Sequence, residues 1–270
     1  LCFFARARAD RITQAISEAT GVAQKGILLA ATHTHYAPAP DCDIYHEAFG
    51  PELCPAYMDS VQSAMVDAAM EAVERAFPAT VSYGCGHCGR EQGVGGNRHD
   101  PGRYAQDPSV NVLAIEDLRG AMRGVLVNYA LHPTLLPPDT DLVSADYVGY
   151  LRKEVLKAYP GAVFGFMQGC SGNQSSRYFR REQSYAEAER FGAAIGREAV
   201  RAVSESKALG KDAALLIRRT LFYPSGMRDI PSKKDADAYA AKAREKYEAM
   251  LAAHAPESDR RSQECAGIGA

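Results

Sequence analysis

The spacing of apolar residues along the chain predicts five helices. In the first, Ile12, Ile16 and the alanines near them fall on one stripe, and Gly21 is a suitable C-cap. Pro55 suits the first turn of the second helix, because the N–H that a proline lacks would have no partner there. The predicted helices cover residues 10–20, 55–76, 146–159, 184–205 and 235–254.

Short apolar runs predict strands that alternate with these helices. The predicted strands cover 27–31, 79–83, 110–115, 124–131, 162–167 and 213–223. Residues 117–120 carry the Asp and Gly typical of a hairpin turn. The alternation favours the α/β class, with a mixed central β-sheet flanked by helices and a site at the strand ends. We expect one domain over residues 1–225, followed by a helical extension and a mobile tail over 226–270.

Two histidines follow the first predicted strand directly, in Thr32-His33-Thr34-His35. Side chains two residues apart in an extended segment point to the same side, so a strand end here places two imidazoles together. His132 ends another predicted strand, and Pro133 stops that strand from continuing. A single histidine is more often structural. Because a tetrahedral Zn²⁺ site takes ligands from distant segments, the three together predict a metal site.

Two more segments carry chemistry, and each has a plain structural alternative. Arg98 ends a glycine-rich run and suits an oxyanion or a carboxylate, unless the run is a surface loop with a solvated arginine. The small polar residues 168–175 follow the predicted strand 162–167, which suits the floor of a site or an ordinary tight turn. Ser175 is not part of a G-x-S-x-G motif, so an α/β-hydrolase triad is not expected.

Composition and charge exclude some classes of function. The 31 basic and 33 acidic residues give a net charge of −2, without the basic surface of a nucleic-acid-binding protein. No stretch of about 18 apolar residues is present, so no membrane-spanning helix is expected. The seven cysteines are an odd number and too sparse for a disulfide scaffold. Residues 1–11 show neither an initiator Met nor a signal peptide. We therefore expect a fragment, and its residues do not predict a cellular compartment.

Cys85-Gly86-His87-Cys88 matches the spacing of thiol–disulfide oxidoreductases, and the glycines at 84, 86 and 89 match a dinucleotide-binding fingerprint. Both motifs need a helix directly after them, to lower the pKa of a thiol or to hold a pyrophosphate. Further glycines follow here, so no helix is expected. Thiol–disulfide exchange is kept as an alternative that insulin reduction would test.

Taken together and in this order, the motifs resemble the neutral and alkaline, non-lysosomal ceramidases and their bacterial relatives, over residues 10–205. The matching stretches are 31–35, Asn97-Arg98, Asp107-Pro108, Val112-Leu113, His132-Pro133, 144–150, and Gln168-Gly169 with Gly172. The resemblance implies a zinc-dependent amidase of lipid metabolism that cleaves the N-acyl bond of ceramide, a sphingolipid. It also implies that the chain is the amino-terminal catalytic region, cut at both ends.

The resemblance implies roles for single residues. His33 and His132 correspond to zinc ligands, and Ser175 to a serine close to the zinc. His35 corresponds to a residue that faces the substrate and is the expected general acid or base, because its unperturbed pKa lies near neutrality. Arg98 also faces the substrate and would stabilise the oxyanion formed when water activated by Zn²⁺ attacks the amide.

Further residues complete the expected site. Substrate contacts are expected from Asn97, Tyr36 and Gln168. A carboxylate such as that of Asp146 would fix the tautomer of a histidine ligand. The resemblance implies that a Glu and a Tyr further along the family's chain complete the metal site, and we expect this sequence to end before them. If they were missing altogether, His35 or a carboxylate such as that of Asp41 or Asp43 would have to replace them.

The chain departs from the family pattern on the substrate side. Tyr36-Ala37-Pro38 follows the histidine pair, where the family has Ser-Gly-Pro or Ser-Ala-Pro. The family's Gly-Asp becomes Gly172-Asn173, and the proline after the aligned serine becomes Ser176. Two alternatives therefore stay open beside ceramide hydrolysis. One is a different amide or an ester as substrate, and the other is a non-catalytic relative that binds a ligand or a cell-surface partner. The expected partners are a lipid or small-molecule substrate and a membrane surface, but no nucleic acid.

Overall fold

The computed structural model describes residues 1–38, 55–137, 139–210 and 232–255. The chain divides into two compact units, Leu1–Leu216 and Ile217–Ala270. The expected domain boundary at residue 225 lies outside the described residues, as do the predicted strand 213–223, the tail after residue 255, and Asp41 and Asp43. These expectations stay predictions.

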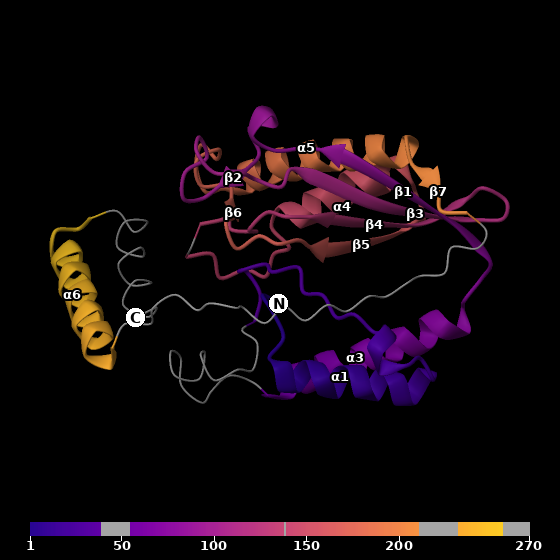
Figure 1. The fold of residues 1–270 in the computed structure, drawn as a ribbon, viewed down its shortest axis with the longest axis horizontal. Coiled ribbons are helices and arrows are strands. Elements are labelled where there is room, and N and C mark those ends of the chain that lie inside the picture. Colours follow the sequence, from indigo (N-terminus) through magenta and orange to yellow (C-terminus); the bar gives the residue numbers. More distant parts are fainter. Residues whose placement is uncertain (39–54, 138, 211–231, 256–270) are drawn as a thin grey trace. The chain divides into compact units, whose positions relative to one another are not determined.

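A five-stranded mixed sheet forms the centre of the first unit, with the strand order β5-β4-β3-β1-β7 (Figure 1). Neighbouring strands pair antiparallel except β4 and β5, which run parallel. The strands are β1 (Ala79–His87), β3 (Ser109–Asp117), β4 (Met122–Tyr129), β5 (Val163–Gln168) and β7 (Lys207–Ala208). Because β4 and β5 are parallel, the loops that follow them leave the same end of the sheet.

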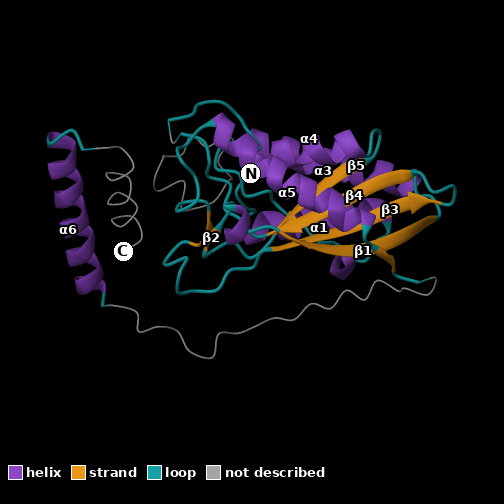
Figure 2. Ribbon diagram, turned by 90° about the horizontal axis from the view of Figure 1, so that it is seen from above, coloured by secondary structure: helices purple, strands orange, loops and turns teal. Residues whose placement is uncertain are grey.

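Two helices cover one face of this sheet, α4 (Tyr147–Ala158) and α5 (Tyr185–Ser204) (Figure 2). Both begin as their sequences predict, since the side chains of Asp146 and Ser184 accept hydrogen bonds from the first turns. The buried face of α5 carries Phe191 and Ile195, which belong to one hydrophobic cluster with the inward-facing valines of β3 and β4. This packing confirms the α/β class and the mixed sheet flanked by helices.

Two further helices of the first unit pack on each other, α1 (Arg6–Thr20) and α3 (Pro55–Glu74). They are joined by an ion pair of 2.5 Å between the buried Arg8 and Asp59. Gly21 ends α1 with a φ of 73°, as the sequence predicts for a glycine C-cap. Single turns of 3₁₀ helix cover Gln24–Gly26 and Arg90–Gln92, and two short strands, β2 (Gly96–Asn97) and β6 (Gln174–Ser175), pair with each other.

The prediction of a buried strand over residues 27–31 is wrong. The segment follows the turn at Gln24–Gly26 and pairs with no described strand, and the side chain of Leu28 is 72% exposed. An apolar run identifies a strand only through burial, but a strand also needs a neighbour that takes its backbone hydrogen bonds. Here the segment runs towards the two histidines without such a neighbour in the described parts of the chain.

Two strand ends also differ from the sequence prediction. β1 continues through Cys85 to His87, beyond the end predicted at residue 83, because β3 pairs along its whole length. β4 ends at Tyr129, so His132 lies three residues beyond the strand rather than directly after it. The hairpin at residues 117–120 is confirmed, with the backbone N–H of Gly120 donating to the carbonyl of Asp117.

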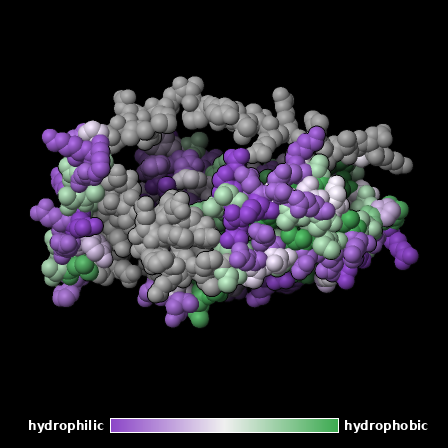
Figure 3. Space-filling view, turned by 90° about the horizontal axis from the view of Figure 1, so that it is seen from below, coloured by the Kyte–Doolittle hydropathy of each residue, from purple (hydrophilic) through white to green (hydrophobic). Residues whose placement is uncertain are grey.

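The described helices include none that is both long and apolar enough to cross a membrane. On the face of the molecule shown in Figure 3, hydrophilic and apolar side chains are intermingled over the coloured residues. The second unit contains α6 (Lys233–Ala252), which begins at Ser232, whose hydroxyl accepts from the backbone N–H of Asp235. The predicted helix over 235–254 is therefore confirmed.

Candidate metal centre

Three imidazoles gather beyond the ends of β4 and β5. One ring nitrogen each from His33, His35 and His132 lies within 4.8 Å of the other two. The ring centroids of His33 and His132 are 4.6 Å apart, and that of His35 is 5.3 and 5.4 Å from them. The sequence therefore predicts the convergence correctly, although His33 has a φ of 61° and is not in an extended strand.

Backbone carbonyls orient two of these rings. The Nδ1 atom of His33 is 2.7 Å from the carbonyl oxygen of Cys2, and that of His132 is 2.9 Å from the carbonyl oxygen of Ser171. A carbonyl oxygen only accepts, so each Nδ1 carries the proton. If both rings are neutral, unprotonated Nε2 atoms face each other, 3.1 Å apart. Two lone pairs at this distance repel unless a cation lies between them or one ring is doubly protonated.

The surroundings of His132 disfavour a second proton on that ring, and the separation of the two Nε2 atoms suits a metal ion. Burial lowers the pKa of His132, and the positive charge of nearby Arg98 lowers it further, although the hydrogen bond to the carbonyl of Ser171 acts in the opposite direction. A doubly protonated His132 is therefore disfavoured. Two nitrogen ligands on a tetrahedral Zn²⁺, with bonds of about 2.0–2.1 Å, lie about 3.3 Å apart, close to the observed separation.

The pairing of β2 with β6 joins the glycine-rich run that ends at Arg98 to the polar segment 168–175. The backbone N–H of Arg98 donates to the carbonyl of Asn173 at 2.8 Å, and that of His132 donates to the carbonyl of Gln174 at 3.2 Å. The loop after β5 thus connects Arg98 to His132. The guanidinium of Arg98 is half-buried and has no hydrogen bond or ion pair with the residues that the structure describes. It is a cation close to the histidines that is available to an anionic group.

The side chains of Asn97 and Ser175 are both buried, and each forms hydrogen bonds with nearby backbone groups. The amide of Asn97 donates to the carbonyl of Ala105 and accepts from the backbone N–H of His99, so both its ends shape the loop. The hydroxyl of Ser175 accepts from the backbone N–H of Arg177 at 3.1 Å. Their proposed contacts with substrate stay predictions.

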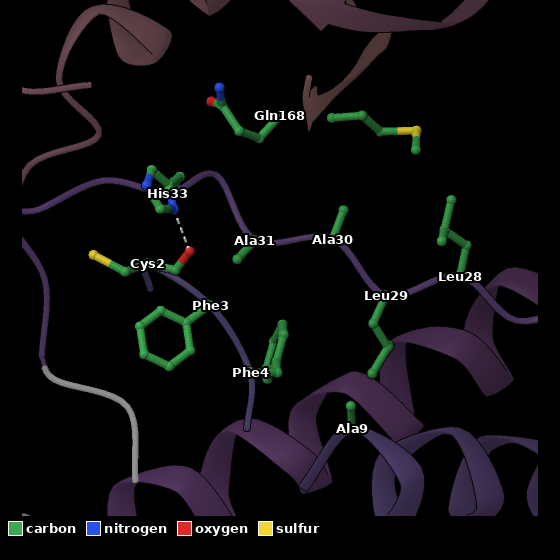
Figure 4. A pocket seen from close by; sticks show the side chains of 11 residues that line it. Cys2, Phe3, Phe4, Ala9, Leu28, Leu29, Ala30, Ala31, His33 and Gln168 are labelled. Atoms are coloured by element: carbon green, nitrogen blue, oxygen red, sulfur yellow. Dashed lines mark hydrogen bonds between the residues drawn. The ribbon is translucent and has the colours of Figure 1, made fainter. Parts of the chain in front are cut away.

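An apolar cavity of about 410 Å³ opens beside His33 (Figure 4). Its walls come from three segments of the first unit. The lining residues are Cys2, Phe3, Phe4, Ala9, Leu28–Ala31, His33, Met167 and Gln168. Gln168 donates from Nε2 to the carbonyl of Leu131 at 3.1 Å, which fixes the orientation of its amide. By contrast, Tyr36 is buried, and its hydroxyl donates to the carbonyl of Leu136 at 2.5 Å.

Asp146 lies near the site but does not orient a histidine, so that expectation is wrong. Backbone carbonyls take that role, and the buried carboxylate accepts instead from the backbone N–H groups of Leu135 and Tyr147. Burial raises the pKa of Asp146 to about 6, and these hydrogen bonds act in the opposite direction. Its position as the N-cap of α4 is readable from the sequence, but its contact with the loop after His132 is not.

The redox alternative has little support. Cys85 and Cys88 are both free thiols, and Cys85 is exposed on β1 while Cys88 is buried. Burial raises the pKa of Cys88 to about 12, whereas an exchange-active thiol needs a lowered pKa. Because Cys85 lies on an extended strand, the segment also lacks the helix N-terminus that such motifs use.

No protein-family model and no curated protein matches the sequence of this chain. A structure described as a ceramidase complexed with C2 aligns with a TM-score of 0.56 and 20% identity, over 73% of this chain and 34% of that chain. The neutral ceramidase of Pseudomonas aeruginosa aligns with a TM-score of 0.55 and 21% identity, over 73% of this chain and 35% of that one. This chain thus spans about a third of the length of these proteins. It shares the fold of part of a bacterial neutral ceramidase.

Proposed function

We propose that this protein is a zinc-dependent hydrolase that cleaves an N-acyl amide bond of a ceramide-like lipid. The observation that carries the proposal is the pair of Nε2 atoms of His33 and His132, which face each other at 3.1 Å. The shared fold supports the same reaction class, because both ceramidase structures align over 73% of the chain. Their low sequence identity leaves the substrate itself to experiment.

The proposed mechanism assigns each residue a separate task. His33 and His132 would hold the metal through Nε2, since a carbonyl oxygen fixes the Nδ1 atom of each. When bound, Zn²⁺ would lower the pKa of a water molecule and so supply a nucleophile near neutral pH. His35 would take a proton from this water and deliver it to the leaving nitrogen. Arg98 would stabilise the negative charge that develops on the carbonyl oxygen.

The remaining predicted residues would act around this centre. Ser175 would orient the water or the substrate, and Gln168 would contact the substrate from the wall of the cavity that also holds His33. Asn97 and Tyr36 would act through the loops that their hydrogen bonds hold in place. The cavity is of a size that ligand pockets have, and its apolar walls suit a hydrocarbon chain.

The reaction class is tested with purified protein and matched substrates. We expect hydrolysis of N-acylsphingosine that stops when a chelator removes the metal and returns when Zn²⁺ is added. Faster hydrolysis of a matched ester, or of a different N-acyl compound, would favour the alternative substrate. A metal-loaded protein that hydrolyses no member of the panel would favour a non-catalytic relative.

Filling the cavity is expected to discriminate between substrates by chain length. Ala30 lines the cavity, so Ala30→Phe should lower kcat/KM for a long-chain N-acyl substrate about tenfold while short-chain substrates change little. Excluding about two buried methylenes accounts for a factor of this order, at about 0.8 kcal/mol for each. The control is Leu118→Phe, which enlarges a side chain that is 76% exposed on the β3–β4 hairpin. An equal loss with all chain lengths would show that the cavity does not hold the chain.

A further inference from the structure

The turn formed by Ser144, Ala145 and Asp146 contacts the segment that carries the first two histidines. The hydroxyl of Thr34, which lies between His33 and His35, donates to the carbonyl of Ser144 at 2.7 Å. The backbone N–H of Ser144 donates in turn to the carbonyl of Tyr36, also at 2.7 Å. The 144–146 turn thus holds this segment at two points.

The same turn contacts the segment that follows His132. The carboxylate of Asp146 accepts from the backbone N–H of Leu135 at 2.8 Å, through its Oδ2 atom. Its Oδ1 atom accepts from the N–H of Tyr147 at 2.6 Å, which anchors the turn to the start of α4. The 144–146 turn therefore connects the two segments whose histidines face each other.

Burial and backbone strain coincide at Asp146, and each also marks the segment of the first two histidines. Thr34 is 5% exposed and Asp146 is 1% exposed, so neither polar side chain is available to solvent. Among the described residues of the first unit, only His33 and Asp146 have a positive φ without being glycine, at 61° and 53°. Such conformations persist where the surrounding contacts enforce them, and they cluster at functional sites.

We propose that Thr34 and Asp146 are positioning residues that set the separation of the His33 and His132 rings. Neither is assigned a direct contact with metal or substrate; both act through the backbone of a histidine-bearing segment. A metal site tolerates displacements of only about 0.5 Å in its ligands, so loosening either contact should weaken binding. The inference rests on the proposed function, because it presupposes a metal between the two rings.

Thr34→Val tests this inference, since valine keeps the shape of threonine and removes the hydroxyl. We expect the dissociation constant for Co²⁺ to rise about tenfold to a hundredfold, as when other supports of metal ligands are removed. We also expect the visible absorption bands of bound Co²⁺ to shift, because they report the geometry of the ligands. Thr34→Ser keeps the hydroxyl and should restore both the affinity and the spectrum.

Ser184→Ala is the matched control for a general loss of stability. It removes a comparable hydrogen bond, which the hydroxyl of Ser184 at the N-cap of α5 accepts from the backbone N–H of Glu187, without touching either histidine segment. It should lower the melting temperature and leave the Co²⁺ spectrum unchanged. If Thr34→Val does not fold, Asp146→Asn gives the same test, because an amide can accept only one of the two hydrogen bonds.

The outcomes separate the inference from the proposed function. A Thr34→Val protein with the affinity and spectrum of the wild type would overturn the positioning role while leaving the metal site intact. A wild-type chain that binds no Co²⁺ or Zn²⁺ would overturn both. Weakened binding with an altered spectrum in Thr34→Val, and neither change in Ser184→Ala, would support the inference.

Discussion

His132→Ala should lower the affinity for Zn²⁺ by more than about a hundredfold. The reason is that one of two facing Nε2 atoms, 3.1 Å apart, disappears. Removing a residue that only supports a metal ligand can already lower the affinity by about this factor. His33→Asn should have a similar effect, and asparagine is the suitable replacement because it tolerates the positive φ of this position. Bound metal measured by elemental analysis after dialysis, together with a competition titration, checks both.

His35→Ala is the informative comparison for these variants. If His35 works on the substrate, this variant keeps most of its affinity for Zn²⁺ while kcat falls by about a hundredfold or more. A loss of metal as large as that in His132→Ala would instead identify a centre of three histidines, which the 4.8 Å spacing of the ring nitrogens also permits. Full metal content in His132→Ala would contradict both arrangements.

Gly192→Ala is expected to destabilise the first unit by about 3 kcal/mol, at the upper end of what overpacking usually costs. A Cβ atom at this position would lie 2.3 Å from the carbonyl oxygen of Tyr147 and 2.6 Å from the Cβ atom of Tyr150. Because the first contact is with backbone of α4, relief requires the two helices to separate. The melting temperature should fall by about 6–12 °C.

Gly149→Ala, within α4, is the control and is not expected to lower the melting temperature. The nearest atom to its added Cβ is that of Ala145, at an ordinary 3.5 Å. Alanine is the better helix former by up to about 1 kcal/mol, so this variant should melt at the same temperature as the wild type or above it. If both variants lower the melting temperature equally, close packing of α4 on α5 is not what Gly192 provides.

The helices and the centre of the sheet could be predicted from the sequence because their burial is periodic. Ile12 and Ile16 on α1, or Phe191 and Ile195 on α5, recur at helical spacing and are buried. Residues 27–31 are apolar without being periodic, and the sequence does not tell whether a partner strand takes their backbone hydrogen bonds. The prediction therefore fails at this segment, where pairing and not hydrophobicity decides the structure.

The histidines could be predicted to converge, but the means by which they do so could not. The sequence suggests one extended strand end, whereas a left-handed residue at His33 and carbonyls from Cys2 and Ser171 orient the rings. Backbone acceptors have no sequence signature. The contact of Thr34 with Ser144 is equally invisible, since it joins residues 110 positions apart.

The segment 27–31 has a consequence for how the protein behaves in concentrated solution. It is an apolar run with no strand partner among the described residues, and β5 is an edge strand of the sheet. Unpaired backbone next to exposed apolar side chains is a template for pairing between molecules. Preparations of this chain should therefore be most prone to intermolecular association at the segment 27–31 and at the edge strand β5. A charged residue in place of Leu28 is the most direct way to reduce association at the segment.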